Sequence, residues 1–261
     1  MTSATDSAVA AHYTTGLLVE RVKAAMQKAG INPDLAGASD LAAGDQFHTG
    51  GLAATEHLIG QLTITSDTRV LDVGCGIGGT SRYIADTTNA HVTGVDITPE
   101  FVETARALGA MVGLSDRTNY HVGSALVMPV PQDAFDIAVM MHVGMNIADK
   151  TTLFSEVARA LRPGGAFALF EVMLGDEGSD LLYPLPWSTV PQTSHVASPA
   201  DYLKAAEAAG FKMCLETDRS AFALSFFEEM RRKNEAEGPS PFGIQLMMGE
   251  TAQEKLVNYV K

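Results

Sequence analysis

The sequence predicts an α/β fold with a doubly wound, mostly parallel sheet and an N-terminal helical cap. Short apolar runs rich in Val, Ile, Leu and Phe recur from residue 70 onward, as expected of buried parallel strands. Segments with the apolar spacing of helices separate these runs. The first run leads directly into a glycine-rich turn. Because strand and helix alternate, right-handed crossovers are expected to place the strands in one open sheet with helices on both faces.

Residues 1–64 form the predicted cap. We expect one helix near Thr14–Lys28 and another near Leu52–Leu62, with a loop rich in Gly, Asp and Pro between them. Two interpretations stay open: the cap covers one face of the sheet, or it closes over a ligand. The core is expected to span residues 65–261 and to carry a substrate-loop insertion around 175–198.

The predicted strands follow in order along the core. Leu153, Val157 and Leu161 share one face of an intervening helix, which is expected to end at Arg162-Pro163-Gly164-Gly165, because Pro cannot continue a helix and Gly supplies a turn with positive φ. The strands are Val70–Val73, His91–Val95, Asn119–Val122, Phe135–Met141 and Ala166–Val172.

The chain after the fifth strand is less regular. A long irregular stretch, Gly175–Ala197, is expected to be functional because unstructured connections of this length are uncommon in compact domains. A helix near Pro199–Ala209 and a strand near Phe211–Glu216 follow, and helical patterns continue to the end. No clear seventh strand is evident.

Composition argues against several classes of partner. The formal net charge of −13 works against binding to polyanionic nucleic acid. Cys75 and Cys214 lack metal-type spacing, so we expect no metal site, no disulfide and a reducing compartment. With neither a secretory signal pattern nor a spanning apolar stretch, we expect no membrane partner and a cytoplasmic location.

The glycine-rich turn is the strongest functional feature. Glycines after the first strand let the backbone approach a ligand where a Cβ atom would clash. Gly74, Gly76 and Gly79 also fit the dinucleotide fingerprint, so the glycines alone leave a nicotinamide cofactor open. Asp96, at the end of the second strand, is expected to accept hydrogen bonds from ribose hydroxyls in either class.

Taken together, four motifs resemble class I S-adenosylmethionine-dependent methyltransferases, which have a Rossmann-like sheet. This resemblance covers roughly residues 65–175 and favours methyl transfer over hydride transfer. The motifs are Leu71-Asp72-Val73-Gly74-Cys75-Gly76-Ile77-Gly78, Val95-Asp96, Phe135-Asp136-Ile137-Ala138 and Leu161-Arg162-Pro163-Gly164-Gly165.

The resemblance implies a seat for S-adenosylmethionine. The glycine turn would border its methionine part, Asp96 its ribose and the turn after the third strand its adenine. Ser124 departs from the family, in which an acid often receives the adenine amino group. The implied cofactor residues are Gly74, Cys75, Gly76, Gly78, Asp96, Ile97, Ser124, Ala125 and His142.

A second resemblance reaches further along the chain. Asp45–Gly51, His142–Lys150 and Tyr183–Trp187 are similar to the subgroup that contains sarcosine and dimethylglycine N-methyltransferases. That subgroup also includes many small-molecule enzymes, so it leaves the substrate open.

Several side chains are candidates for the chemistry. His142 follows the fourth strand and is the first candidate for a general base, because histidine titrates near neutral pH. Glu171, near the end of the fifth strand, is the second catalytic candidate. The substrate-binding candidates are His48, Tyr183, Trp187 and His195.

The sequence therefore predicts methyl transfer to a small molecule by in-line displacement. An amine nitrogen is plausible as the acceptor, and oxygen or carbon is possible. Two alternatives stay open: an NAD-dependent oxidoreductase, and a non-catalytic protein that binds S-adenosylmethionine.

Overall fold

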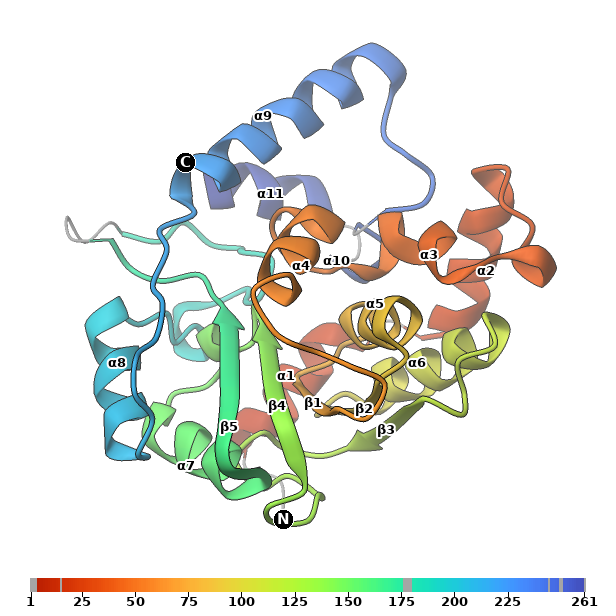
Figure 1. Cartoon of the computed structure of the whole chain (residues 1–261). Coiled ribbons are helices and arrows are strands. Elements are labelled where there is room, and N and C mark those ends of the chain that lie inside the picture. Colours follow the sequence, from red (N-terminus) through yellow and green to blue (C-terminus); the bar gives the residue numbers. More distant parts are fainter. Residues whose placement is uncertain (1–3, 15, 176–179, 244, 249–250, 261) are drawn as a thin grey trace.

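The central sheet has five parallel strands in the order β3-β2-β1-β4-β5 (Figure 1). The structure is a computed structural model, and it describes residues 4–14, 16–175, 180–243, 245–248 and 251–260. It confirms the doubly wound α/β class and all five expected strands of the core. The strands are β1 (Arg69–Val73), β2 (His91–Asp96), β3 (Thr118–Val122), β4 (Phe135–Met141) and β5 (Leu161–Phe170).

Alternate residues of the inner strands enter two separate cores. Leu71 and Val73 of β1 pack in the cluster that includes residues of α7 (Lys150–Ala160) and α8 (Pro199–Ala208). Val70, the residue before Leu71, points to the other face and packs with residues of α4 (Gly51–Ile59) and α5 (Gly79–Thr88). Since successive side chains of a strand point to opposite faces, both faces of the sheet are covered. Helix α6 (Pro99–Met111) lies beside α5 in Figure 1.

The cap contains more helix than expected. The helix predicted near residues 14–28 is α2 (Leu18–Lys28), and Thr15 of that prediction lies outside the described residues. An unexpected helix, α1 (Ala4–Tyr13), precedes it. The loop predicted between the two cap helices is partly wrong, because it contains α3 (Ala38–Asp45) and the short turn η1 (Pro33–Leu35). Leu41, fully buried, packs α3 against α2, and this tertiary contact outweighs the low helix propensity of its Gly and Asp residues.

The predicted strand near Phe211–Glu216 is wrong. The segment makes no strand ladder within the described part of the chain, although its apolar residues alternate. Phe211 packs on Phe154 and Phe167, but Met213 and Leu215 are 54% and 63% exposed. Alternation predicts a strand only where a neighbour supplies backbone partners, and here one side chain alone reaches the core.

Other boundaries differ from the expectation by a few residues. Strand β5 starts at Leu161, and its pairing with β4 has an irregularity at residues 162–165, where a turn was expected. Residues 176–179 of the long connection lie outside the described residues; the remainder includes the short turn η3 (Pro191–Thr193).

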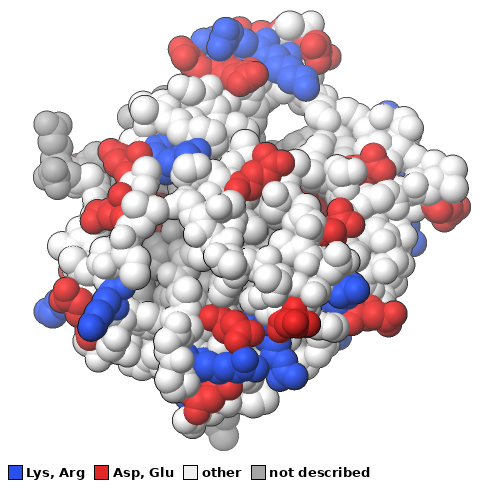
Figure 2. Space-filling view, in the orientation of Figure 1, with Lys and Arg blue, Asp and Glu red and all other residues white. Residues whose placement is uncertain are grey.

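The C-terminal helices lie above the carboxyl ends of β4 and β5 (Figure 1). They are α9 (Ser220–Glu237), α10 (Gln245–Met248) and α11 (Ala252–Val260). On the face shown in Figure 2, acidic and basic side chains are interspersed. None of the helices in the described ranges is both long and apolar enough to cross a membrane.

Candidate functional site

The turn between β1 and α5 opens toward a cavity. Gly74 and Gly76 have φ angles of 71° and 54°, which favour glycine. A Cβ atom on Gly74 would lie 2.3 Å from Val143, so this glycine permits the close approach of the chain after β4. A Cβ atom on Gly76 would meet no heavy atom within 4 Å, so its backbone is open to a ligand.

Asp96 lies at the end of β2 and binds the same turn. Its Oδ2 accepts the backbone N–H of Gly76 at 2.9 Å, and its Oδ1 accepts that of Thr98 at 2.8 Å. Burial raises the pKa of this carboxyl, and the two backbone bonds oppose the shift. Each carboxylate oxygen has a further lone pair, so the group, which lines the cavity, retains the capacity to accept ribose hydroxyls.

The cavity lies at the carboxyl ends of the strands and contains about 970 Å³ of empty space, part of it open to solvent. Parallel α/β sheets commonly bind their ligands at this edge. Gly78 does not line it: a Cβ atom there would instead lie 2.6 Å from the hydroxyl of Tyr120. Every other cofactor residue implied by the sequence lines the cavity, namely Gly74, Cys75, Gly76, Asp96, Ile97, Ser124, Ala125 and His142.

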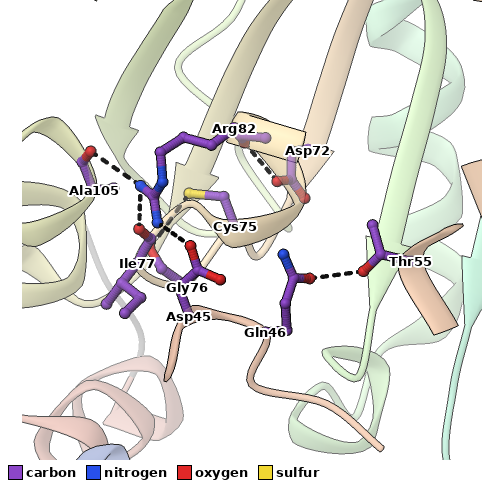
Figure 3. A network of polar contacts seen from close by, with 10 residues as sticks. Asp45, Gln46, Thr55, Asp72, Cys75, Gly76, Ile77, Arg82 and Ala105 are labelled. Atoms are coloured by element: carbon purple, nitrogen blue, oxygen red, sulfur yellow. Dashed lines mark hydrogen bonds and ion pairs between the residues drawn. The ribbon is translucent and has the colours of Figure 1, made fainter. Parts of the chain in front are cut away.

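A buried ion pair joins Arg82 to Asp45, which lines the cavity (Figure 3). Nη2 of Arg82 lies 2.7 Å from Oδ2 of Asp45, and both side chains are almost fully buried. Nη1 of Arg82 donates to the carbonyl of Ile77 at 2.8 Å. The pair thus ties α3 to the glycine turn and to α5.

A second carboxylate lies beside the pair. Asp72 on β1 accepts a hydrogen bond from the hydroxyl of Ser81 at 2.6 Å. Burial raises the pKa of Asp72 to about 6, and the bond from Ser81 opposes the shift. Both Asp72 and Asp45 line the cavity, so its wall presents acidic groups toward a cationic ligand.

Three buried oxygen atoms of the cavity wall have no partner in the described structure. They are Oδ1 of Asp45, Oγ1 of Thr98 and Oδ1 of Asn146. Buried polar atoms usually have hydrogen-bond partners, so unpartnered ones at a cavity point to a polar ligand. Acceptor oxygens suit the ammonium and hydroxyl donors of S-adenosylmethionine, whose functional groups therefore fit this wall.

A second cavity of about 470 Å³, which we call the aromatic chamber, adjoins the first. The two share Tyr13, Phe47, His48 and His142. The chamber is lined by side chains from the cap, the long connection and the C-terminal helices: Tyr13, Phe47, His48, Thr49, His142, Met145, Pro186, Trp187, Phe226, Phe227, Met248, Leu256 and Tyr259.

Edge-to-face contacts fix the walls of the chamber. The rings of Trp187 and Tyr259 are 5.3 Å apart at 89°, and those of Phe227 and Tyr259 are 5.2 Å apart at 86°. Such arrangements are favourable for aromatic quadrupoles. Trp187 also donates from Nε1 to the hydroxyl of Ser194 at 2.9 Å, so the indole has a fixed orientation.

Two histidines separate the cavities. The rings of His48 and His142 are 6.0 Å apart. Burial lowers the pKa of His48 to about 4 and that of His142 well below its usual value, so both are neutral near pH 7. His142 itself has a φ of 55°, and its backbone N–H donates to the carbonyl of Phe170 at 2.8 Å.

The other candidate side chains take different places. Glu171 lines neither cavity; its two oxygens each accept a backbone N–H at 3.0 Å, from Val143 and Gly144. Burial raises the pKa of Glu171 to about 7. Through these two hydrogen bonds, the Glu171 carboxyl orients the backbone that follows β4. Trp187 lines the chamber, whereas Tyr183 and His195 line neither cavity.

The sequence did not single out several residues of the site. Tyr13 comes from the unexpected helix α1, and its hydroxyl accepts a bond from Asn146 at 3.4 Å. Asn146 lies within His142–Lys150, a segment that the sequence analysis used only for its resemblance to the N-methyltransferase subgroup. Phe226 and Tyr259 belong to the C-terminal helices, where an aromatic residue is an ordinary packing residue by sequence. Within the described ranges no cluster of His, Cys, Asp or Glu could hold a metal ion.

Comparison with known proteins agrees with this geometry. Residues 71–169 match the family model described as a methyltransferase domain. A chloroplast protein of Oryza sativa subsp. japonica, described as a probable tocopherol O-methyltransferase, is 36% identical over 169 residues, covering 58% of this chain and 43% of that protein. The chain thus matches less than half the length of this curated relative.

Two solved structures have the same fold. Phosphoethanolamine N-methyltransferase 2 of Haemonchus contortus, in complex with S-adenosyl-L-methionine, aligns with a TM-score of 0.70 and 18% identity over 99% of this chain and 55% of that one. A Galdieria sulphuraria protein described as a putative sarcosine dimethylglycine methyltransferase aligns with a TM-score of 0.63 and 20% identity over 80% of this chain and 79% of that one.

These matches are to a methyltransferase domain and to proteins described as methyltransferases, which favours the S-adenosylmethionine class over the nicotinamide class that the glycine spacing left open. The family model spans the strands and the turn that form the first cavity, and the solved relatives share the sheet. Residues 71–169, less than half of the chain, thus match a methyltransferase domain, and the chain has the Rossmann-like fold of the solved methyltransferases.

Proposed function

We propose that this chain transfers a methyl group from S-adenosylmethionine to a small-molecule acceptor. One observation carries the proposal: a cavity lined by buried carboxylates at the carboxyl ends of β1 and β2 adjoins, at a pair of histidines, a separate aromatic chamber. In this arrangement the first cavity binds the methyl donor and the second binds the acceptor.

The chain's own residues supply binding and orientation. Asp96 binds the ribose, and the open backbone at Gly76 accommodates the donor. S-adenosylmethionine supplies a reactive methyl group on a positively charged sulfur. Holding an acceptor in line with that group contributes effective molarities of about 10⁵–10⁸ M, which is a large part of the rate enhancement. The chamber walls exclude water from the reaction.

We further infer that residues 1–64 act as a cap on the core of residues 65–261. Tyr13, Phe47 and His48 of the cap line both cavities, which supports the interpretation that the cap encloses ligands. The net charge of −13 supports a role without nucleic acid, and the free thiols of Cys75 and Cys214 support a cytoplasmic location.

Ligand binding and turnover test the proposal together. We expect S-adenosylhomocysteine at 100 times its dissociation constant to stabilise the protein by about 2.7 kcal/mol. Labelled S-adenosylmethionine should then transfer its methyl group to a member of a panel of amines, acids and phenols. Stabilisation by NADH without stabilisation by S-adenosylhomocysteine would overturn the proposal. Binding without any labelled product would favour a non-catalytic binding protein.

A further inference from the structure

The described walls of the aromatic chamber carry no formal charge. Its lining consists of aromatic, aliphatic, threonine and neutral histidine side chains. Lys255 lies close by on α11, but its Nζ donates to the carbonyl of Met248 at 2.9 Å and it does not line the chamber. Burying an unpaired ion in such surroundings is costly, so the chamber disfavours charged acceptors.

Most polar atoms of the chamber already have partners. The hydroxyls of Thr49 and Tyr259 bind each other at 3.0 Å, and Tyr13 accepts its bond from Asn146. Besides the hydroxyl proton of Tyr13 and one hydroxyl proton of the Thr49–Tyr259 pair, this leaves one nitrogen on each of the two histidines, where the chamber meets the first cavity. These two nitrogens differ in hydrogen-bonding character.

His48 has a lone pair available. Its Nε2 lies 3.0 Å from Oγ1 of Thr55, and that hydroxyl donates to Oε1 of Gln46 at 2.7 Å. Because the hydroxyl proton is directed to Gln46, Nε2 of His48 must carry the proton of its bond. The Nδ1 atom of His48 is then unprotonated, and it makes no hydrogen bond to the described residues.

The orientation of Gln46 supports this assignment. Burial raises the pKa of Asp45, and Arg82 together with the Gln46 amide opposes the shift. The amide oxygen of Gln46 lies 2.7 Å from Oγ1 of Thr55, so it accepts the hydroxyl proton. Figure 3 shows the amide oxygen of Gln46 directed at Thr55.

His142 has the opposite character. Its Nδ1 accepts the backbone N–H of Thr49 at 3.4 Å, so the proton of this neutral ring resides on Nε2. His142 therefore presents an N–H donor. Together the two rings offer an acceptor and a donor, which is the pattern that binds a hydroxyl group.

We propose that the aromatic chamber takes a neutral, largely apolar acceptor bearing a hydroxyl, and that His48 Nδ1 receives the hydroxyl proton while His142 Nε2–H binds the oxygen. This inference rests on the proposed methyl-transfer function. The acceptor oxygen forms a bond to the methyl carbon, the methyl–sulfur bond breaks with its electron pair left on sulfur, and the proton moves to His48. The imidazole gains one positive charge as sulfur loses one, so the net charge of the buried site is unchanged.

The substrate class is tested by three phenols that differ only in the charge of their tail: 4-butylphenol, tyramine and 3-(4-hydroxyphenyl)propionate. Trp187 is the only tryptophan of the chain and lines the chamber, so its fluorescence reports occupancy. With S-adenosylhomocysteine present, we expect 4-butylphenol to quench saturably and the two charged phenols to bind at least tenfold more weakly. Absent or weaker binding of 4-butylphenol would overturn the inference.

A charge variant and a matched control locate the effect. Phe226 lines the chamber from α9, whereas Leu224 on the same helix is 59% exposed and lines neither cavity. Phe226→Glu is expected to shift the preference toward tyramine by at least tenfold. Leu224→Glu should leave all three affinities within twofold of the wild type.

The roles of the histidines are separated by comparing 4-butylphenol with 4-butylanisole, which accepts a hydrogen bond but cannot donate one. The wild type should prefer the phenol at least tenfold, and His48→Phe should abolish that preference. His142→Phe should weaken both ligands and keep the preference, because a donor serves either oxygen. The reverse pattern, or no preference in the wild type, would refute the assignment.

Separate readouts keep the two proposals apart. Binding of S-adenosylhomocysteine is measured by calorimetry for every variant, which also shows that each variant is folded. If S-adenosylhomocysteine fails to bind the wild type, the proposed function fails. If it binds and the phenol series behaves otherwise than stated, only the present inference fails.

Discussion

The cofactor cavity and the aromatic chamber meet at the same two histidines but are built in different ways. The cavity combines buried carboxylates with apolar side chains, and its main features follow β1 and β2 directly, as Gly76 and Asp96 do. The chamber is apolar and joins segments as distant as Tyr13 and Tyr259. Backbone geometry at strand ends thus forms one site, and packing of remote helices forms the other.

The difference separates the requirements for binding the methyl donor from those for selecting the acceptor. A donor common to many methyltransferases needs fixed backbone and a carboxylate, which one supersecondary unit supplies. An acceptor is selected by shape and polarity, which many segments supply together. Changes in the cavity should therefore alter donor affinity, and changes in the chamber should alter acceptor choice.

The largest expected effect on stability comes from replacing Arg82, whose ion-pair partner Asp45 lines the cofactor cavity. Arg82→Met leaves the buried carboxylate of Asp45 without its ion-pair partner, and we expect the free energy of unfolding to fall by about 3–5 kcal/mol in urea denaturation. Arg231→Met is the control, since its ion pair with Glu235 is exposed; we expect a change within about 0.5 kcal/mol. A loss below about 1 kcal/mol for Arg82→Met would show that the pair does not fix this region.

The pH dependence of stability probes the boundary between the two sites. The pKa of His48 falls from 6.5 to about 4 on folding, so the unfolded state binds more protons between these values. The stability that the neutral ring contributes is complete above pH 6.5 and is lost as the pH falls through about 4. At about 1.4 kcal/mol per unit, the loss is about 3 kcal/mol.

A variant isolates this contribution. Burial raises the pKa of Asp72 and Glu171, which gives the opposite dependence, so wild type and His48→Phe are compared by urea denaturation across the same pH range. The wild type should lose about 3 kcal/mol more than the variant between pH 6.5 and 4. Parallel profiles would mean that His48 is accessible to water.

Donor affinity is expected to depend on Asp96. Asp96→Ala leaves ribose hydroxyls unpaired, and we expect the dissociation constant of S-adenosylhomocysteine to rise at least tenfold, equivalent to about 1.4 kcal/mol. Calorimetry measures the change. Asp86→Ala, an exposed acid on α5, is the control. An unchanged constant for Asp96→Ala would remove this residue from the site.

The smallest effect concerns the chamber wall. Tyr259→Phe keeps the aromatic contacts and removes the hydrogen bond to Thr49, so we expect a loss of about 1 kcal/mol in stability and no change in donor affinity. Tyr83→Phe, which removes a hydroxyl that makes no hydrogen bond to the described residues, serves as the control. Weaker donor binding by Tyr259→Phe would contradict the separation of the two sites.

Much of the cofactor cavity was predictable from the sequence because its residues follow strands directly. The apolar runs predicted all five strands, and a ligand at their carboxyl ends follows from the parallel arrangement. The prediction that Gly78 borders the cofactor is not supported in the same way. The motif includes Gly78, but this glycine lies against Tyr120 and does not line the cavity.

The chamber and the roles of the histidines were not predictable in the same way. Tyr13 and Phe226 are ordinary helical aromatics until the chain brings them together. The sequence suggested His142 as the base, but hydrogen bonding from Thr49 and to Thr55 decides which ring presents a lone pair, and these partners are fixed only by folding.

The sequence by itself determined the alternation of strands and helices, the glycine turn and the carboxylate one strand away, because each depends on residues close together in the chain. Only the tertiary structure decided which aromatic side chains enclose an acceptor, which carboxylate pairs with Arg82 and which imidazole nitrogen is free. The physical reason is that these properties belong to contacts between distant segments, whose partners no local pattern specifies.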